Sequence, residues 1–226
     1  MSRWYSNVSL IDEDPEPPDV LPRGRHAASR EVVAESQRRR MLVALAEVVA
    51  EKGYGATSVA DVIEGARVSR RTFYEHFANK EECFLAAYDA GVQSLLHAIA
   101  ASPGPTADDP ERARRAAAGT YLGLLADNPA FARAFLVEVL AAGPRALQRR
   151  AAVRERFAGF LAERHLATAL RTGEPQPPAH VFRAAVGAID ELVTDRLLTQ
   201  GAASLPGLLD AVVDVERRLL SRAPAP

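Results

Sequence analysis

The sequence predicts an all-α fold, and three observations lead to that prediction. Apolar residues recur every three or four positions through most of the chain, which is the spacing of an amphipathic helix. No strand-length run of alternating β-branched residues lies between turn residues. Proline, which interrupts helices, is absent from Arg23 through Ser102. The 226 residues, 48% of them apolar and 25% charged, are typical of a globular chain with one or two domains.

The two ends of the chain differ in composition from the rest. Residues 1–22 contain four prolines and five acidic residues, which is typical of a disordered acidic tail, and residues 223–226 form a second short tail. No stretch approaches the ~18 consecutive apolar residues of a membrane span, and no basic-then-apolar signal opens the chain. We therefore expect a cytoplasmic protein without a membrane partner.

The proline-free window predicts four helices. An apolar stripe ends at Gly53, a residue type that suits the position after a helix. A hydroxyl residue, Thr57 or Ser58, can cap a short second helix, and Ser69 and Asn79 can cap the third and fourth. The apolar residues that these helices would bury are, in order, Leu42, Leu45 and Val49; Val59, Val62 and Ile63; Phe73 and Phe77; and Phe84, Leu85, Tyr88, Val92, Leu95 and Ile99.

Prolines and glycine at residues 103–105 then interrupt the chain, and further helices follow. Pro110 and Pro129 suit the first turns of two of them, and a long arginine-rich helix comes next. The proline cluster at residues 175–178 separates that helix from two final apolar helices, roughly Ala179 to Gln200 and Leu205 to Ser221. The C-terminal half is therefore predicted to be a helical bundle.

Few residues suggest a metal site or catalysis. The single cysteine, Cys83, excludes an internal disulfide and a zinc site built from several cysteines. His97, His165 and His180 have no metal-ligand spacing with one another or with carboxylates. The sequence also lacks a nucleophile–base motif and a glycine loop for phosphate. It thus predicts no metal, no cofactor and no catalytic residue.

Residues 53–84 contain the pattern that indicates a function. A short helix, a short turn and a helix opened by Ser69 make a helix-turn-helix. Phe73 and Phe77 lie four residues apart and anchor one face of the third helix. Arginine can donate a bidentate pair to guanine, and hydroxyl or imidazole groups can reach phosphates or base edges. The other faces of this helix carry such side chains: Arg70, Arg71, Thr72, Tyr74 and His76.

The same segment contains a recurring set of residues: Gly53, Tyr54, Thr57, Ser58, Val59, Val68, Ser69, Thr72, Phe73, Tyr74, His76, Phe77, Lys80 and Glu81. Through them, residues 39–88 strongly resemble the DNA-binding domain of the TetR/AcrR family of transcriptional regulators. The resemblance implies an N-terminal three-helix helix-turn-helix DNA-binding domain, residues 23–82, joined to a C-terminal helical ligand-binding and dimerisation domain, residues 83–222. It also implies that Thr57, Tyr74 and Lys80 contact the DNA backbone, while the third helix faces the major groove.

One position departs from the pattern of the family. The family usually has glycine in the turn before Val68 and Ser69, where this chain has Arg67. If the turn requires a positive φ there, arginine costs about 1 kcal/mol, which contact between its side chain and DNA could offset. Arg23 and Arg25, before the first helix, could form an arm that enters a minor groove, or simply a solvated basic surface.

The C-terminal half supplies candidate residues for a pocket and an interface. Its aromatic residues are core first of all, but some could line an effector pocket, since helical bundles hold ligands between their helices. These are Tyr121, Phe131, Phe135, Phe157 and Phe160. The last two helices carry more apolar residues than one buried face needs, and the resemblance implies that they form a dimer interface. The candidates there are Leu192, Val193, Leu197, Leu209, Val212, Val213 and Leu219.

Acidic residues of the penultimate helix admit two interpretations. Asp190, Glu191 and Asp195 could meet a cationic ligand. Ion pairs with the nearby Arg183 and Arg196 are the simpler alternative, and we expect those.

These observations together predict a homodimeric regulator that binds a palindromic operator in double-stranded DNA and is associated with the nucleoid. The family resemblance favours a repressor released by a small-molecule effector, which the sequence leaves unknown. One alternative is a DNA-binding protein of the same fold that acts through a protein partner. The other is an α-helical enzyme, whose catalytic groups could converge in space without a sequence motif.

Overall fold

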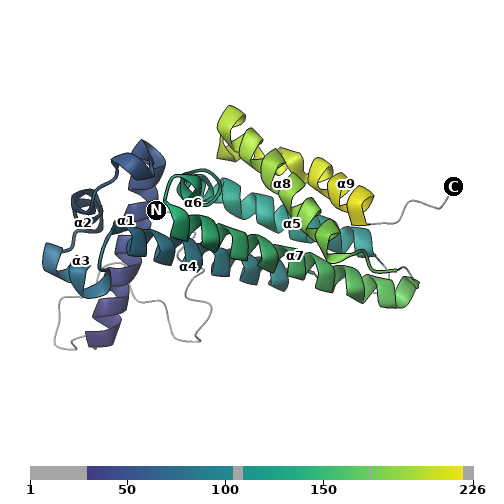
Figure 1. The fold of residues 1–226 in the computed structure, drawn as a ribbon, viewed down its shortest axis with the longest axis horizontal. Coiled ribbons are helices and arrows are strands. Elements are labelled where there is room, and N and C mark those ends of the chain that lie inside the picture. The colour runs from purple at the N-terminus through teal and green to yellow at the C-terminus, as the bar shows by residue number, and fades with distance from the viewer. Residues whose placement is uncertain (1–29, 104–108, 174, 221–226) are drawn as a thin grey trace.

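The computed structural model describes residues 30–103, 109–173 and 175–220, and every regular element in these ranges is a helix (Figure 1). This confirms the predicted all-α fold. The N-terminal tail, residues 223–226 and the candidate arm residues Arg23 and Arg25 lie outside the described residues. The α-helices and 3-10 helices are α1 (Arg30–Ala56), α2 (Val59–Ala66), α3 (Arg70–His76), α4 (Lys80–Ala101), α5 (Pro110–Asp127), α6 (Pro129–Leu136), η2 (Glu138–Leu140), α7 (Pro144–Thr172), α8 (Ala179–Gln200), η3 (Ala202–Leu208) and α9 (Leu209–Leu220).

Helices α1 to α3 form a unit at one end of the molecule (Figure 1). The regular course of α1 breaks at Gly53, whose φ of 81° is open to glycine but strained for other residues. Ser58, not Thr57, caps α2: its Oγ accepts from the backbone N–H of Asp61, and the Asp61 carboxylate accepts from the N–H of Ser58. Lys52 lies 2.7 Å from the same carboxylate. The hydrogen bonds from Lys52 and Ser58 hold the pKa of Asp61 well below its usual range.

The third helix is anchored as the sequence predicts. Ser69 caps α3 by accepting from the backbone N–H of Thr72 at 3.0 Å. Phe73 and Phe77 are buried beneath it, with ring centroids 5.7 Å apart. Cys83, at the start of α4, belongs to the same core, and burial raises the pKa of its thiol to about 12. Its predicted role as a small core residue is confirmed.

Helix α4 joins this unit to the C-terminal bundle (Figure 1). Among the described helices it is the one long and apolar enough to cross a membrane by length and composition, and 56% of its most apolar window is buried within the protein. It packs against α1, α5, α6 and α7. One continuous core therefore runs from beneath α3 into the bundle.

The C-terminal bundle contains α5 to α9, with α7 running along most of its length (Figure 1). The predicted helix Ala179–Gln200 is confirmed as α8. The predicted start of the last helix is wrong: Ala202–Leu208 form the 3-10 helix η3, and α9 begins at Leu209. Pro206 has no backbone N–H to donate and Gly207 weakens a helix, so the regular α-helix begins only after both.

Candidate nucleic-acid interface and buried cavity

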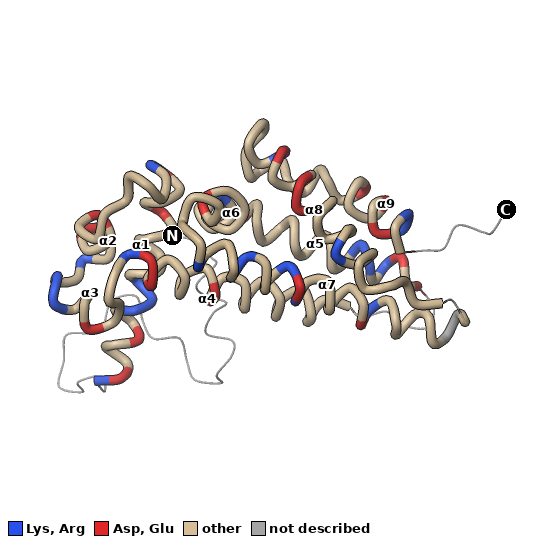
Figure 2. Tube along the Cα trace, viewed as in Figure 1, with Lys and Arg blue, Asp and Glu red and all other residues tan. Residues whose placement is uncertain are grey.

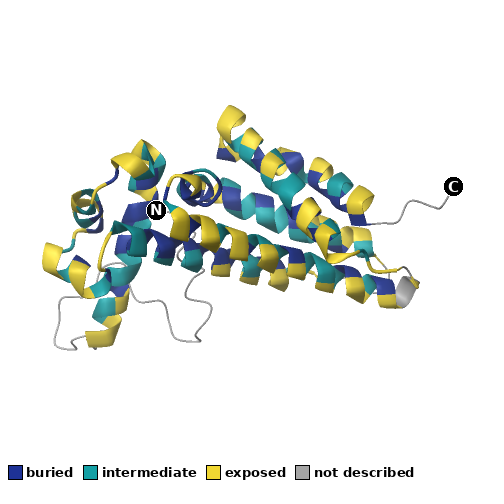
Figure 3. Ribbon diagram, in the orientation of Figure 1, coloured by how far each residue is buried: buried dark blue, intermediate teal, exposed yellow. Residues whose placement is uncertain are grey.

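The outer face of α3 is the exposed end of the N-terminal unit (Figure 3). Arg70 and Arg71 are exposed and Tyr74 is 46% exposed, while Phe73 between them is buried. Two cations and an amphipathic ring therefore project from one short helix whose opposite face is fixed in the core. This is the geometry expected of a helix that enters a groove of DNA.

Two of these exposed side chains lie beside a second polar or aromatic group. The Nε of Arg71 donates to Glu75 at 2.9 Å, and the Arg70 guanidinium lies 5.7 Å from the centroid of the Tyr74 ring. In Figure 2 the blue segment at the outer end of α3 shows where its basic residues lie. Since exposed ion pairs contribute little to stability, Arg71 can leave Glu75 for a phosphate or a base at little cost.

Ser69, Thr72 and His76 fill the remaining predicted positions of α3. The Ser69 and Thr72 hydroxyl oxygens are 2.8 Å apart, so the helix cap already uses them. His76 is partly buried, and burial followed by the nearby Arg38 lowers its pKa. His76 is therefore neutral at neutral pH, with one ring N–H to donate.

Arg67 occupies the turn between α2 and α3 in the left-handed region, with φ 52° and ψ 49°. It is the one residue other than glycine with a positive φ among those the structure describes. Its backbone N–H closes the end of α2 onto the carbonyls of Glu64 and Ile63. The expectation that this turn needs a positive φ is confirmed, and the arginine side chain is exposed beside α3.

Two residues predicted to contact the DNA backbone, Thr57 and Lys80, bond to carbonyls of their own chain instead. Thr57 is only 3% exposed, and its hydroxyl donates to the Gly53 carbonyl at 2.8 Å, so the expectation that it faces phosphate is wrong for this conformation. The Lys80 ammonium donates to the carbonyls of Tyr54 and Thr57, both at 2.7 Å, and lies 4.1 Å from the Tyr54 ring centroid. Burial lowers the pKa of Lys80. Two of its three N–H groups thus close the α1–α2 turn, which leaves one for phosphate.

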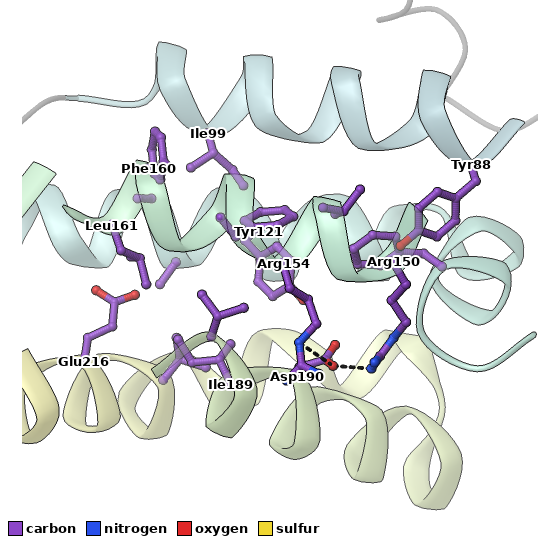
Figure 4. A pocket seen from close by; sticks show the side chains of 17 residues that line it. Tyr88, Ile99, Tyr121, Arg150, Arg154, Phe160, Leu161, Ile189, Asp190 and Glu216 are labelled. Atoms are coloured by element: carbon purple, nitrogen blue, oxygen red, sulfur yellow. Dashed lines mark hydrogen bonds and ion pairs between the residues drawn. The ribbon is translucent and has the colours of Figure 1, made fainter. Parts of the chain in front are cut away.

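The bundle encloses a cavity of about 80 Å³ between α4, α5, α7, α8 and α9 (Figure 4). A single water needs ~10–15 Å³ on this measure, so the cavity has the space of about five to eight waters, enough for a small organic molecule. Four of the five predicted aromatics line it: Tyr121, Phe135, Phe157 and Phe160. Phe131 does not line this cavity. It stacks behind Phe135 at 5.3 Å and borders a separate, smaller space beside α1.

The polar residues of this cavity were not among the residues predicted from the sequence. Asp190 accepts from Arg150 and lies 3.9 Å from the Nε of Arg154, so two arginines of α7 meet one carboxylate of α8. The predicted pairing of Asp190 with Arg183 or Arg196 is wrong: Arg183 bonds to Glu155 on the surface instead. Burial raises the pKa of Asp190 against the opposing effect of the two arginines.

Glu216 of α9 lies at the opposite end of the cavity (Figure 4). Its carboxylate is 3.6 Å from the Nε of Arg114, yet burial raises its pKa to about 7. Within residues 30–103, 109–173 and 175–220, no three His, Cys, Asp or Glu side chains are grouped so that they could hold a metal ion.

Several predicted interface residues lie inside the monomer. Val193, Val212 and Val213 are at most 4% exposed, and Val212 lines the cavity. They cannot contact a second chain, so that part of the prediction is wrong. Of the candidates, Leu219 of α9 is exposed, as are Leu198 of α8 and Ala211 of α9, while Val215 between Ala211 and Leu219 is half-buried. Leu192, Leu197 and Leu209 are half-buried.

Polar contacts connect the bundle to the N-terminal unit. The buried Glu138 accepts from the Tyr54 backbone N–H at 2.8 Å and lies 3.2 Å from Arg133. Along α7, Arg145 bonds to Glu81 at 3.1 Å and Arg149 lies 3.4 Å from Asp89, both on α4. Another face of α7 carries Arg150 and Arg154 at the cavity, so this one helix contacts both α4 and the polar end of the cavity.

Comparison with known proteins identifies the helix-turn-helix. Residues 41–87 match the model for bacterial regulatory proteins of the tetR family. The chain is 28% identical over 95 residues to the HTH-type transcriptional activator FasR of Mycolicibacterium smegmatis. This alignment covers 42% of this chain and 43% of FasR. It is 31% identical over 118 residues to the HTH-type transcriptional regulator EthR of the same species, and this alignment covers 50% of this chain and 51% of EthR. The chain thus spans about half the length of these curated relatives, and both are named as HTH-type transcriptional regulators or activators.

The similarity in fold extends over most of the chain. A regulatory protein of the tetR family from Rhodococcus RHA1 superimposes with a TM-score of 0.65 at 26% identity, over 83% of this chain and 98% of that one. The fatty acid degradation regulator FadR from Bacillus halodurans gives a TM-score of 0.71 at 19% identity, over 84% and 97%. Residues 41–87 are thus similar to the DNA-binding segment of the tetR family, and the chain as a whole shares the fold of solved proteins of that family.

Proposed function

We propose that this protein is a sequence-specific DNA-binding regulator of transcription, most simply a repressor. The exposed face of α3 carries the proposal, since Arg70, Arg71 and Tyr74 project from a helix anchored by Phe73. The match of residues 41–87 to the tetR family supports it. In this assignment residues 23–82 bind DNA, and residues 83–222 bind an effector and a second copy of the chain.

The division of work among the residues follows from their chemistry. Arg70 and Arg71, in the first turn of α3, read base edges in the major groove. Tyr74, His76 and the third N–H of Lys80 bind phosphates, which position the helix without reading sequence. The caps formed by Ser69 and Thr72 hold the first turn in place, so these two residues act chiefly by positioning the arginines.

Dimerisation follows from the size of α3. Seven residues bury little surface, so two copies on successive half-sites are needed for affinity and for a long enough recognition sequence. We assign the interface to the outer faces of α8 and α9, where Leu198 is 56% and Leu219 is 40% exposed beside Ala211 and Val215. Two-fold pairing through this surface predicts a palindromic operator.

An effector regulates DNA binding if it favours one spacing of the two α3 helices over another. The cavity and the α7 contacts supply a physical route: a ligand that shifts Arg150 or Arg154 acts on the helix that holds Glu81 and Asp89 of α4. Because α4 begins beside α3, a small displacement of α4 reorients the reading helix. We expect the protein to act in the cytoplasm, at its operators on the chromosome.

Fluorescence anisotropy tests the proposal. The purified full chain is titrated onto DNA from upstream of its own gene, at several salt concentrations and with nonspecific competitor. We expect tight binding that survives the competitor and falls linearly on a log–log plot against salt. Binding to every fragment that disappears with competitor would contradict the assignment of a sequence-specific regulator.

A further inference from the structure

The cavity in the bundle has one polar end within an otherwise apolar wall (Figure 4). At that end Arg150 and Arg154 of α7, Asp190 of α8 and Tyr88 of α4 come together. We propose that this cavity binds an amphipathic monocarboxylate, whose carboxylate is held by Arg150, Arg154 and the Tyr88 hydroxyl. The binding claim stands on the cavity alone, and its regulatory meaning rests on the proposed function.

The Tyr88 hydroxyl is the first observation that points to a ligand. The side chain is 3% exposed, and its hydroxyl has no hydrogen-bond partner among the described residues. A buried hydroxyl without a partner is costly, and native proteins rarely leave one so. In Figure 4 this oxygen points from α4 toward Arg150 at the edge of the cavity. A ligand oxygen placed between them would accept from both groups.

The charges at the polar end favour an anion. Two guanidinium groups face the single carboxylate of Asp190, which leaves a local net charge of +1. Each guanidinium has five N–H groups, so its bonds to Asp190 leave several donors unused. A bound carboxylate neutralises this end and pairs with arginine in the geometry that arginine favours. An ammonium ligand would instead meet two like charges in a site of low dielectric constant.

Gly187 of α8 shows how Arg154 is held at the cavity. A Cβ atom at Gly187 would lie 2.9 Å from a terminal nitrogen of Arg154, so the guanidinium rests against bare backbone. Any larger residue at this position would displace the arginine. The glycine thereby leaves room for Arg154 to lie beside Asp190 at the cavity, although it comes from a different helix.

The rest of the cavity defines the apolar part of the ligand. Arg150 and Leu161 line the two ends and are eleven residues apart on α7, so these two positions are about 16 Å apart along the helix axis. Tyr121, Phe157 and Ile189 form the walls between them. Glu216 closes the far end, where burial disfavours the charged form of a carboxyl group, so a second carboxylate on the ligand would be disfavoured there. A straight-chain monocarboxylate of medium length, such as decanoate, matches this arrangement.

Isothermal titration calorimetry of the full chain tests the inference with three probes of equal chain length: decanoate, its methyl ester and decylamine. We expect decanoate to bind at least tenfold more tightly than either of the others, because only decanoate can form charge-assisted hydrogen bonds with the arginines. Arg150→Met should weaken decanoate about tenfold or more. The matched control is Arg183→Met, which removes an arginine and its ion pair from the outer surface of α8 and should leave binding unchanged.

Two further variants separate anion binding from the alternatives. Tyr88→Phe removes one hydroxyl, keeps the packing, and should weaken decanoate about fivefold without lowering the thermal midpoint, since the hydroxyl is unpaired. Asp190→Asn removes the competing carboxylate and should tighten decanoate about fivefold. A cationic ligand predicts the reverse, because it would need Asp190.

Decylamine binding in place of decanoate, or full decanoate affinity in Tyr88→Phe, would overturn the inference, as would the absence of decanoate binding. The Tyr88→Phe result decides the matter even if Arg150→Met fails to fold. DNA binding is measured on the unliganded protein in parallel. Operator binding without decanoate binding refutes this inference alone, and decanoate binding without operator binding refutes the proposed function alone.

Discussion

Replacing Arg67 by glycine should make the protein more stable, although it removes a long side chain. With φ 52° and ψ 49°, Arg67 pays the left-handed cost of about 1–2 kcal/mol. Glycine avoids that cost but gives the unfolded chain extra freedom worth about 0.4–1 kcal/mol. The net gain for Arg67→Gly is therefore about 0.5–1 kcal/mol, or roughly 1–4 °C in the thermal midpoint of a chain of this size.

Urea denaturation followed by circular dichroism measures the change, with Arg67→Ala as the control. Alanine loses the side chain but keeps the Cβ atom, so its stability should stay near that of the wild type. Both variants should bind DNA more weakly and with a log–log salt slope shallower by about 0.9, because one exposed cation beside α3 is lost. A glycine variant less stable than the alanine variant would refute the left-handed turn and the reasoning built on it.

Three further predictions follow from the geometry. Tyr74→Ala should weaken DNA binding similarly for all sequences, whereas Arg70→Ala should change which sequence is preferred; anisotropy on an operator and a scrambled fragment compares them. In the folded protein the pKa of Glu216 is about 7, above its ordinary value of 4.5. Its contribution to the free energy of unfolding is therefore complete below pH 4.5, where the carboxyl is protonated in both states, and is lost as the pH rises to and through 7. Unfolding free energies should therefore fall by up to about 3 kcal/mol between about pH 4 and pH 8, and Glu216→Gln should abolish this component; a variant with the wild-type pH profile would contradict it. Leu219→Arg places a charge on the exposed face of α9 and should give a monomer in analytical ultracentrifugation, while a variant that stays dimeric would move the interface elsewhere.

The helix-turn-helix could be predicted because its determinants are local. Ser69 caps α3 through a residue three positions away, and Phe73 and Phe77 share one face by spacing alone. Gly53 and Arg67 mark breaks that depend on the backbone angles of single residues. Such features depend on a few neighbouring residues, so periodicity and capping rules can predict them.

The polar end of the cavity could not be predicted in the same way. Asp190 pairs with Arg150, 40 residues earlier, while the sequence rules for ion pairs reach only one helical turn. The tyrosine opposite them, Tyr88, reads as an ordinary member of an apolar stripe. One feature of the sequence could have indicated it: α7 is rich in arginine, and one face of this helix must pack against the bundle.

The interface prediction failed in part for a related reason. A helix with a surplus of apolar residues can bury its second face against its own chain or against a partner, and composition does not distinguish the two. In α9, Val212 and Val213 face inward, whereas Ala211 and Leu219 are turned outward by the helical period. The prediction for Thr57 failed for the same reason: a hydroxyl can bond to DNA or to its own chain, and this one donates to the Gly53 carbonyl.

The central claim is that α3 reads DNA sequence through Arg70 and Arg71, and selection of genomic fragments tests it most directly. Purified full-length protein is mixed with sheared genomic DNA and nonspecific competitor, and the retained fragments are sequenced. The account predicts enrichment of one palindromic motif, its loss in the Arg70→Ala, Arg71→Ala double variant, and its retention in Arg183→Ala. No enriched motif for the wild type, or the same motif for the double variant, would contradict it.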